Sequence, residues 1–119
     1  MALHLQIGQL GESIAREYLQ KKGYKIIEQN YRTKYAEIDL VVVKENILVF
    51  MEVRTRTGEM FGTPEESINR KKRKKLMRNA VAYIARRRNR QVYRIDAVCV
   101  VLNKDFSVNR INHYENITS

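Results

Sequence analysis

Two short runs of mostly apolar, often β-branched residues, at 37–44 and 47–54, constrain the fold more than any other feature of the chain. Such runs are typical of buried strands. The two residues between them, Glu45 and Asn46, suit a tight turn because asparagine tolerates a positive φ angle. The sequence therefore predicts an antiparallel hairpin.

The register of this hairpin brings acidic residues together. With a two-residue turn at 45–46, Asp39 faces Glu52 and Glu37 faces Arg54 across the two strands. Directly opposed residues have Cβ atoms ~4.5–5.5 Å apart on one face of a sheet. Two carboxylates are therefore expected side by side in otherwise apolar strands, where unpaired or opposed like charges are costly.

Two kinds of partner could compensate the charges of Asp39 and Glu52. A divalent cation such as Mg²⁺ or Mn²⁺ favours carboxylate oxygens, also binds phosphate oxygens and lowers the pKa of a bound water. Salt bridges to Arg54, Arg56 or Arg32 on an exposed sheet face are the other answer. Residue spacing alone leaves these alternatives even.

The rest of the chain alternates between helical and strand patterns. Apolar residues at three- and four-residue spacing predict a helix over 4–22, which Gly23 ends in a left-handed cap. Residues 63–66 form a capping box with proline at the first helical position, which predicts a long helix from Pro64 to about Arg88. The other expected elements are a strand at 24–31, a loop at 55–62, a strand within 91–102, a turn at 103–105 and a last strand near 107–114. This order predicts an α+β domain with helices packed on a mixed sheet.

A third acid, Glu12, lies on the predicted N-terminal helix. It falls beside Gly8, Ala15 and Leu19 at the edge of the apolar stripe. Its side chain can therefore point towards the sheet or form an ordinary surface charge. Spacing does not decide between the two.

Positive charge is concentrated in one segment. The chain has 23 Lys and Arg against 13 Asp and Glu, a net charge of +10. Residues 67–90 contain no acid, and their basic residues are Arg70, Lys71, Lys72, Arg73, Lys74, Lys75, Arg78, Arg86, Arg87, Arg88 and Arg90. Because solubility alone does not require a single sign of charge, this segment favours a polyanionic partner, nucleic acid above all.

Length and composition bound the class of protein. A chain of 119 residues fits one domain, 1–119. Its apolar runs are far shorter than the ~20 residues of a membrane span, and its first ten residues do not resemble a signal peptide. The lone Cys99 excludes an internal disulfide, and His4 and His113 lie near opposite chain ends without a metal-ligand spacing. These features predict a cytoplasmic protein with no membrane partner.

Successive short motifs along the chain resemble one known family. They are Gly11-Glu12, Ala15, Tyr18-Leu19, Gly23-Tyr24, Asn30-Tyr31-Arg32, Glu37-Ile38-Asp39-Leu40, Val49-Phe50-Met51-Glu52-Val53-Arg54, Thr63-Pro64 and Arg94-Ile95-Asp96. This pattern is similar to that of the uncharacterised bacterial YraN-like proteins over nearly the whole chain. That family resembles archaeal Holliday junction resolvases and the PD-(D/E)xK nuclease superfamily. The resemblance implies a restriction-endonuclease-like fold, with a central mixed sheet flanked by helices.

The resemblance also implies roles for individual residues. Asp39 would be the metal-binding aspartate, Glu52 the second ligand of Mg²⁺ or Mn²⁺, and the Val53 carbonyl would complete the ligands. Glu12 would be the helix-borne acid. Arg54 stands where the superfamily places a lysine, and arginine can clamp a phosphate but effectively cannot lose a proton.

Two further positions bear on this comparison. Ala36 stands where the family usually places a glycine. Lys72 matches a family lysine in the long helix and would supply an amine if it faces the site. Alternatively, its stem packs along the helix and its charge reaches solvent.

Three functions remain open on this basis. The first is a metal-dependent endonuclease acting on structured or branched DNA, with Arg54 and Arg56 holding the scissile phosphate. The second is a non-catalytic nucleic-acid-binding protein on a degenerate nuclease fold, and the third is a basic module for an acidic protein partner. The residues expected at nucleic acid are Arg32, Arg56, Arg70, Lys71, Lys72, Lys74, Lys75 and Arg78. Because resolvases act as dimers, the resemblance also makes a homodimer an expectation.

Overall fold

The computed structural model describes residues 2–87 and 91–118, and these form five strands, two α-helices and one short 3₁₀ helix. In chain order the elements are α1 (Ala2–Lys21), β1 (Lys25–Arg32), β2 (Glu37–Lys44), β3 (Ile47–Thr57), η1 (Glu65–Ser67), α2 (Arg70–Arg87), β4 (Tyr93–Leu102) and β5 (Val108–Tyr114). The predicted α+β class is confirmed, and the arrangement is compatible with a restriction-endonuclease-like fold. The predicted helix end at Arg88 and the basic residue Arg90 lie outside the described residues.

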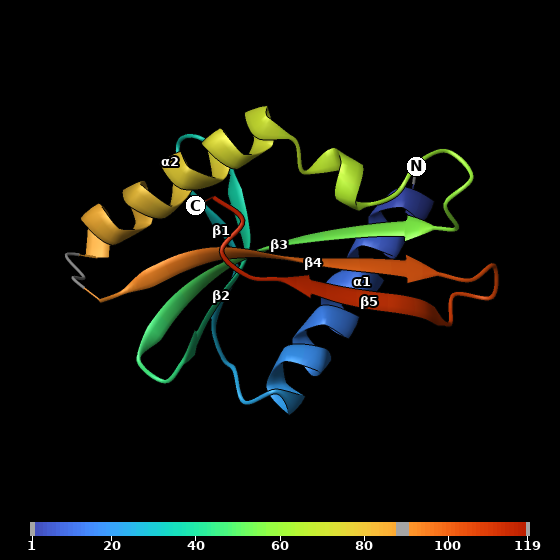
Figure 1. The fold of residues 1–119 in the computed structure, drawn as a ribbon, viewed down its shortest axis with the longest axis horizontal. Coiled ribbons are helices and arrows are strands. Elements are labelled where there is room, and N and C mark those ends of the chain that lie inside the picture. Colours follow the sequence, from blue (N-terminus) through green and yellow to red (C-terminus); the bar gives the residue numbers. More distant parts are fainter. Residues whose placement is uncertain (1, 88–90, 119) are drawn as a thin grey trace.

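The five strands form one mixed sheet in the order β1-β2-β3-β4-β5. Strands β3 and β4 run parallel, and α2 lies in the connection between them; all other neighbours are antiparallel. The two helices lie on opposite faces of this sheet (Figure 1). Alternate residues of β3 serve the two faces, since Val49 and Met51 pack in the α1 core while Leu48 and Phe50 pack in the α2 core.

The hairpin between β2 and β3 forms in the predicted register. Lys44 pairs with Ile47, and the ladder continues to the pair of Leu40 and Met51. Glu45 and Asn46 have φ angles of 51° and 66°, as a two-residue turn with the twist of the strands requires. The predicted pairing of Glu37 with Arg54 is wrong, because the ladder ends first and Glu37 instead pairs with Arg32 of β1.

Strand β3 is longer than predicted. It continues to Thr57, where the sequence favoured a loop from residue 55 onwards. The extra residues pair with β4, from Arg54 beside Cys99 to Thr57 beside Leu102. A strand in a parallel pair depends on a partner far along the chain, which local sequence does not reveal.

The long helix also begins later than predicted. The capping box forms, with the Thr63 amide donating to Glu66 Oε2 at 2.9 Å and the Glu66 amide donating to Thr63 Oγ1 at 3.3 Å. However, it begins only η1, because Ile68 leaves the helical region at φ −96° and ψ 65°. The α2 helix starts afresh at Arg70, where the side chain of Asn69 accepts the Lys72 amide at 2.9 Å.

Contacts with β5 hold η1 apart from α2. Arg110 of β5 binds Glu65 at 2.7 Å and Glu59 at 2.8 Å, and the Tyr114 hydroxyl donates to Glu65 at 2.7 Å. The hydrogen bond from Arg110 lowers the pKa of Glu65 to about 2. These tertiary bonds fix the 59–67 segment on the sheet, so the helix cannot extend straight from its first capping box.

Helix α1 approaches β3 very closely at Gly11. A Cβ atom built on Gly11 would lie 1.8 Å from Thr55 Oγ1 and 2.8 Å from Thr55 Cβ. Only a residue without a side chain fits at this crossing, which brings the next residue, Glu12, down to the sheet. Within residues 2–87 and 91–118, neither helix combines the length and apolar character needed to cross a membrane.

The Gly11 contact predicts opposite effects for the same substitution at two positions of α1. We expect Gly11→Ala to lower the free energy of unfolding by about 1–3 kcal/mol, because the added methyl group overpacks the helix–sheet contact. Gly8→Ala meets no atom within 4 Å and should raise stability by roughly 0.5–1 kcal/mol through helix propensity. Urea unfolding of both variants checks this; a Gly11→Ala protein as stable as the parent would contradict the close packing.

Candidate functional site

Asp39 lies where the β2–β3 ladder opens. The last paired residues are Leu40 and Met51, so Asp39 comes directly after the final pair. Its carboxylate Oδ2 accepts the backbone amide of Val53 at 2.8 Å. The Asp39 side chain thus accepts a hydrogen bond from an amide that would otherwise donate to a backbone carbonyl of β2. It lies at the point where the two strands separate.

Glu52 is buried beside Asp39, and only 3% of its surface is exposed. Its Oε2 atom lies 3.2 Å from Lys72 Nζ of α2 and 3.2 Å from Arg54 Nε of β3. The Arg54 contact is an ion pair without hydrogen-bond geometry, since that buried nitrogen has no hydrogen-bond partner among the described residues. The charge of Glu52 is therefore balanced by two cations from different elements.

The electrostatics of this cluster favour a proton on Asp39. Burial raises the pKa of Asp39, and the nearby charges of Glu52 and Glu12 raise it further, although the Val53 hydrogen bond opposes them. A side-chain hydrogen bond between Asp39 and Glu52 also favours the protonated carboxyl group. The structure therefore brings these two sequence-predicted acids together through their side chains, although they lie beyond the last ladder pair and are not paired along the strands as predicted.

Glu12 joins the cluster from the α1 side. Burial raises its pKa, with Glu37 and Glu52 adding to the effect, whereas Arg16 and a hydrogen bond with Asn30 lower it. The side chain is half-buried rather than free on the helix surface. The sequence left this orientation open, and the close contact between Gly11 and the sheet explains the outcome.

Some of the basic residues predicted from the sequence contact acidic residues, and the others are exposed to solvent. The ammonium group of Lys72 contacts Glu52, so the alternative prediction that its charge reaches solvent is wrong. Arg32 instead forms a long 3.8 Å ion pair with Glu37, while Arg56 is exposed at the end of β3. The remaining basic positions named from sequence are exposed on α2, namely Arg70, Lys71, Lys74, Lys75 and Arg78.

The oxygen donors available here are the carboxylates of Asp39 and Glu52, together with the backbone carbonyl of Val53, the residue that follows Glu52 in β3. Such hard oxygen donors suit Mg²⁺ or Mn²⁺. Among the described residues, no group of three or more His, Cys, Asp and Glu side chains has the arrangement of a metal site. Any cation would therefore rest on two carboxylates, with backbone and solvent supplying other ligands.

Sequence reasoning missed a second buried carboxylate, Asp96 of β4. Its oxygens contact Arg94 Nε at 3.0 Å, His113 Nε2 at 2.8 Å and the Asn116 amide at 2.9 Å. Burial raises the pKa of Asp96, but these hydrogen bonds outweigh it and the net shift is downward. This fully paired group ties β4, β5 and the C-terminal segment together, and Arg94-Ile95-Asp96 in the sequence gave no hint of the distant histidine.

The fold and this cluster define a class of protein: a mixed-sheet α+β domain with a carboxylate pair in the sheet and a basic crossover helix. The sequence pattern of the Uncharacterised protein family UPF0102 matches residues 11–100, a range that includes every residue of the cluster. The chain belongs to this family, and the resemblance to YraN-like proteins is confirmed.

Several relatives match over most of their length. A UPF0102 protein of Alkaliphilus metalliredigens is 43% identical over 108 residues, which cover 90% of this chain and 95% of the relative. A UPF0102 protein of Caldanaerobacter subterraneus subsp. tengcongensis is 42% identical, with 92% of each chain covered. One from Clostridium botulinum is 41% identical, covering 82% of this chain and 80% of its own.

The half-buried Asp39 and the buried Asp96 predict opposite responses to loss of charge. An aspartate whose pKa is raised in the folded state destabilises the fold once the pH rises above the ordinary aspartate pKa, near 4. In EDTA at pH 8, Asp39→Asn should therefore raise the free energy of unfolding by roughly 1–3 kcal/mol, because the amide still accepts the Val53 hydrogen bond. The gain should vanish as pH falls towards about 4.

Asp96→Asn is the matched control for this measurement. Its pKa is lowered, so its charge stabilises the fold and the same substitution should reduce stability at pH 8. Urea unfolding of both variants across pH checks the contrast. A loss of stability in Asp39→Asn equal to that in Asp96→Asn would contradict the electrostatics described for the cluster.

Proposed function

We propose that this protein is a metal-dependent endonuclease that hydrolyses phosphodiester bonds in structured or branched DNA. The observation that carries the proposal is the pairing of Asp39 with the buried Glu52 at the open end of the β2–β3 ladder. A strand interior rarely holds two adjacent carboxylates without a counter-charge, because the cost of burial is high. Lys72, from the basic helix α2, reaches the same glutamate.

A divalent cation fits this oxygen donor set. Asp39, Glu52 and the Val53 carbonyl would hold Mg²⁺ or Mn²⁺. The ion would lower the pKa of a bound water and neutralise charge on the scissile phosphate. Glu12 adds a nearby acid from α1 that can hold a proton, since its burial raises its pKa.

Arg54 and Lys72, the two cations that contact Glu52, would also contact the substrate in this proposal. Arg54 is partly exposed, and its planar guanidinium suits two phosphate oxygens at once. Lys72 supplies the amine that Arg54 cannot: its compact ammonium group, held beside Glu52, would position the attacking water and offset charge on the phosphate. Arg56 lies two residues further along the same strand, so it shares the face of Arg54.

The basic helix supports a nucleic acid as the substrate. Six of its cations fall within its first nine residues, Arg70 to Arg78, if Lys72 is set aside: Arg70, Lys71, Arg73, Lys74, Lys75 and Arg78. Contacts of such residues with phosphates give affinity without sequence preference. A homodimer that cuts two related strands is part of the same proposal.

A second candidate function rests on one observation. The Oε2 atom of Glu52 already has Lys72 and Arg54 as partners, so its charge is compensated without a metal. A protein that binds nucleic acid without cleaving it needs nothing more. This candidate predicts salt-sensitive binding, since each phosphate contact releases counterions, but no cleavage with any metal.

A cleavage assay separates the two candidates. Purified protein is incubated with junction, flap, duplex and single-stranded DNA in Mg²⁺, Mn²⁺ or EDTA. The endonuclease proposal predicts cleavage that requires metal and falls to the EDTA background in Asp39→Asn, whereas DNA affinity changes less than about twofold because the charge lost is not on the binding helix. Cleavage that continues unchanged in Asp39→Asn would refute the site.

Arg54→Lys, with Arg56→Lys as its matched control, tests the role of the arginine. If the parent binds DNA without cutting it and Arg54→Lys alone cuts, the arginine has disabled a nuclease scaffold. If none of these proteins cuts any substrate despite binding, the binding-only function is correct. Affinity that is independent of ionic strength would contradict both candidates.

A further inference from the structure

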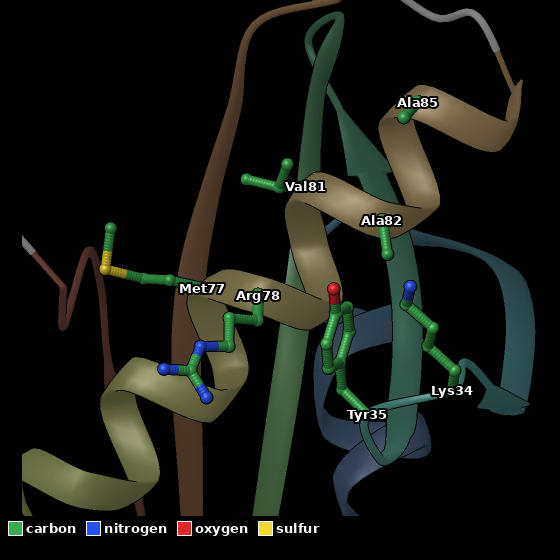
Figure 2. Close-up of a pocket in the computed structure, with 7 residues that line it drawn as sticks. All are labelled: Lys34, Tyr35, Met77, Arg78, Val81, Ala82 and Ala85. Atoms are coloured by element: carbon green, nitrogen blue, oxygen red, sulfur yellow. The ribbon is translucent and has the colours of Figure 1, made fainter.

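A groove lies between the outer side of α2 and the β1–β2 turn, and none of its lining residues belongs to the carboxylate cluster. It has a volume of about 440 Å³ and is lined by Lys34, Tyr35, Met77, Arg78, Val81, Ala82 and Ala85. In Figure 2 the ring of Tyr35 stands beside α2 between the side chains of Arg78 and Lys34. The groove thus has an apolar floor, one aromatic wall and a cation on either side.

The apolar part of this groove is open to solvent. Tyr35 is 48% exposed, Met77 45% and Val81 55%, although each contributes a large apolar surface. Met77, Val81 and Ala85 follow one another at four-residue spacing, so they form a continuous stripe on α2. An exposed apolar stripe on an otherwise basic helix is a candidate binding surface.

The groove is held in shape by a buried residue of α2. Thr33 Oγ1 donates to the Oδ1 atom of Asn79, and Asn79 is only 1% exposed. The same hydroxyl accepts the backbone amides of Tyr35 at 3.1 Å and Ala36 at 3.3 Å. These bonds fix the backbone of the β1–β2 turn against α2, so the segment that carries the Tyr35 ring is in place before a ligand binds.

Charge decides what kind of ligand fits. Helix α2 contains no acidic residue, and Lys34 Nζ lies 5.3 Å from the centre of the Tyr35 ring. A second copy of this helix would meet the groove with the same sign of charge and be repelled. An anionic ligand with flat apolar parts matches the surface, and unpaired nucleotides have both properties.

We propose that this groove binds an unpaired base of the nucleic acid, with Tyr35 stacking on the base and Arg78 and Lys34 contacting the flanking phosphates. The inference rests on the proposed function, because it assumes that α2 binds nucleic acid. Asp39 follows Tyr35 by four residues, so the Cα atoms of these two residues are at most about 14 Å apart. The substrate class is therefore nucleic acid with single-stranded nucleotides close to the site, such as a flap or an open branch point.

Binding of fluorescently labelled DNA, followed by anisotropy in EDTA, tests this proposal. Three probes are compared: a single strand, a duplex with a single-stranded flap, and a blunt duplex. Tyr35→Ala should weaken binding of the first two about 5- to 100-fold, the range for loss of one stacked base, and leave the blunt duplex within about twofold. Tyr35→Phe keeps the ring and should bind all three as the parent does.

Phe106→Ala is the matched control. Phe106 is 44% exposed, similar to Tyr35, but belongs to the turn between β4 and β5, which lies at the other end of the sheet from the C-terminal half of α2 (Figure 1). Its loss should leave binding of all three probes unchanged. Circular dichroism and thermal unfolding of Tyr35→Ala and Phe106→Ala check that both variants are folded.

Three results would overturn the proposal. If Tyr35→Ala binds all three probes equally more weakly, Tyr35 is a general contact near the phosphates. If Tyr35→Ala binds every probe as tightly as the parent, Tyr35 is not part of the interface. In both cases the parent still binds and the proposed function stands. Self-association in sedimentation that Val81→Lys abolishes would show that a second copy covers the groove. A parent protein that binds none of the probes would instead refute the proposed function itself.

Discussion

The structure depends on balancing one buried charge, the carboxylate of Glu52. This residue lies within the sheet, where an unpaired charge is costly, and its partners come from two directions: Arg54 from the same strand and Lys72 from α2. The contact with Lys72 ties the start of the basic helix to the sheet. Breaking a buried pair by removing one partner leaves an uncompensated charge, so the orientation of α2 and the cluster around Asp39 depend on each other.

The carboxylate pair could be predicted from the sequence because its determinants are local. A two-residue turn at 45–46 fixes the hairpin register, and strand alternation then sets the faces of Asp39 and Glu52. Opening of the ladder beyond Leu40 was not predictable, since it depends on the Asp39 side chain taking the Val53 amide. Whether the Val53 amide donates to a backbone carbonyl or to the Asp39 carboxylate depends on the three-dimensional arrangement of both acceptors.

Other features depend on residues far apart in the sequence. The capping box at 63–66 forms as its sequence indicates, yet Arg110 holds the following turn on β5 and α2 starts only after Asn69. Likewise, the strand pattern of β3 gives no sign of its extension along β4. The direction of Lys72 was left open because a helical lysine can turn either way, and only the position of Glu52 settles it.

We propose that the Asp39 and Glu52 pair binds a cation in addition to forming internal ion pairs. Calorimetric titration of the metal-free protein with Mn²⁺ tests it most directly, without a substrate. We expect saturable binding in the parent that weakens at least about 10-fold in Asp39→Asn and in Glu52→Gln, because each removes a charged ligand. Asp105→Asn, on the exposed β4–β5 turn, should leave the affinity unchanged. No binding in the parent, or equal binding in all four proteins, would contradict it.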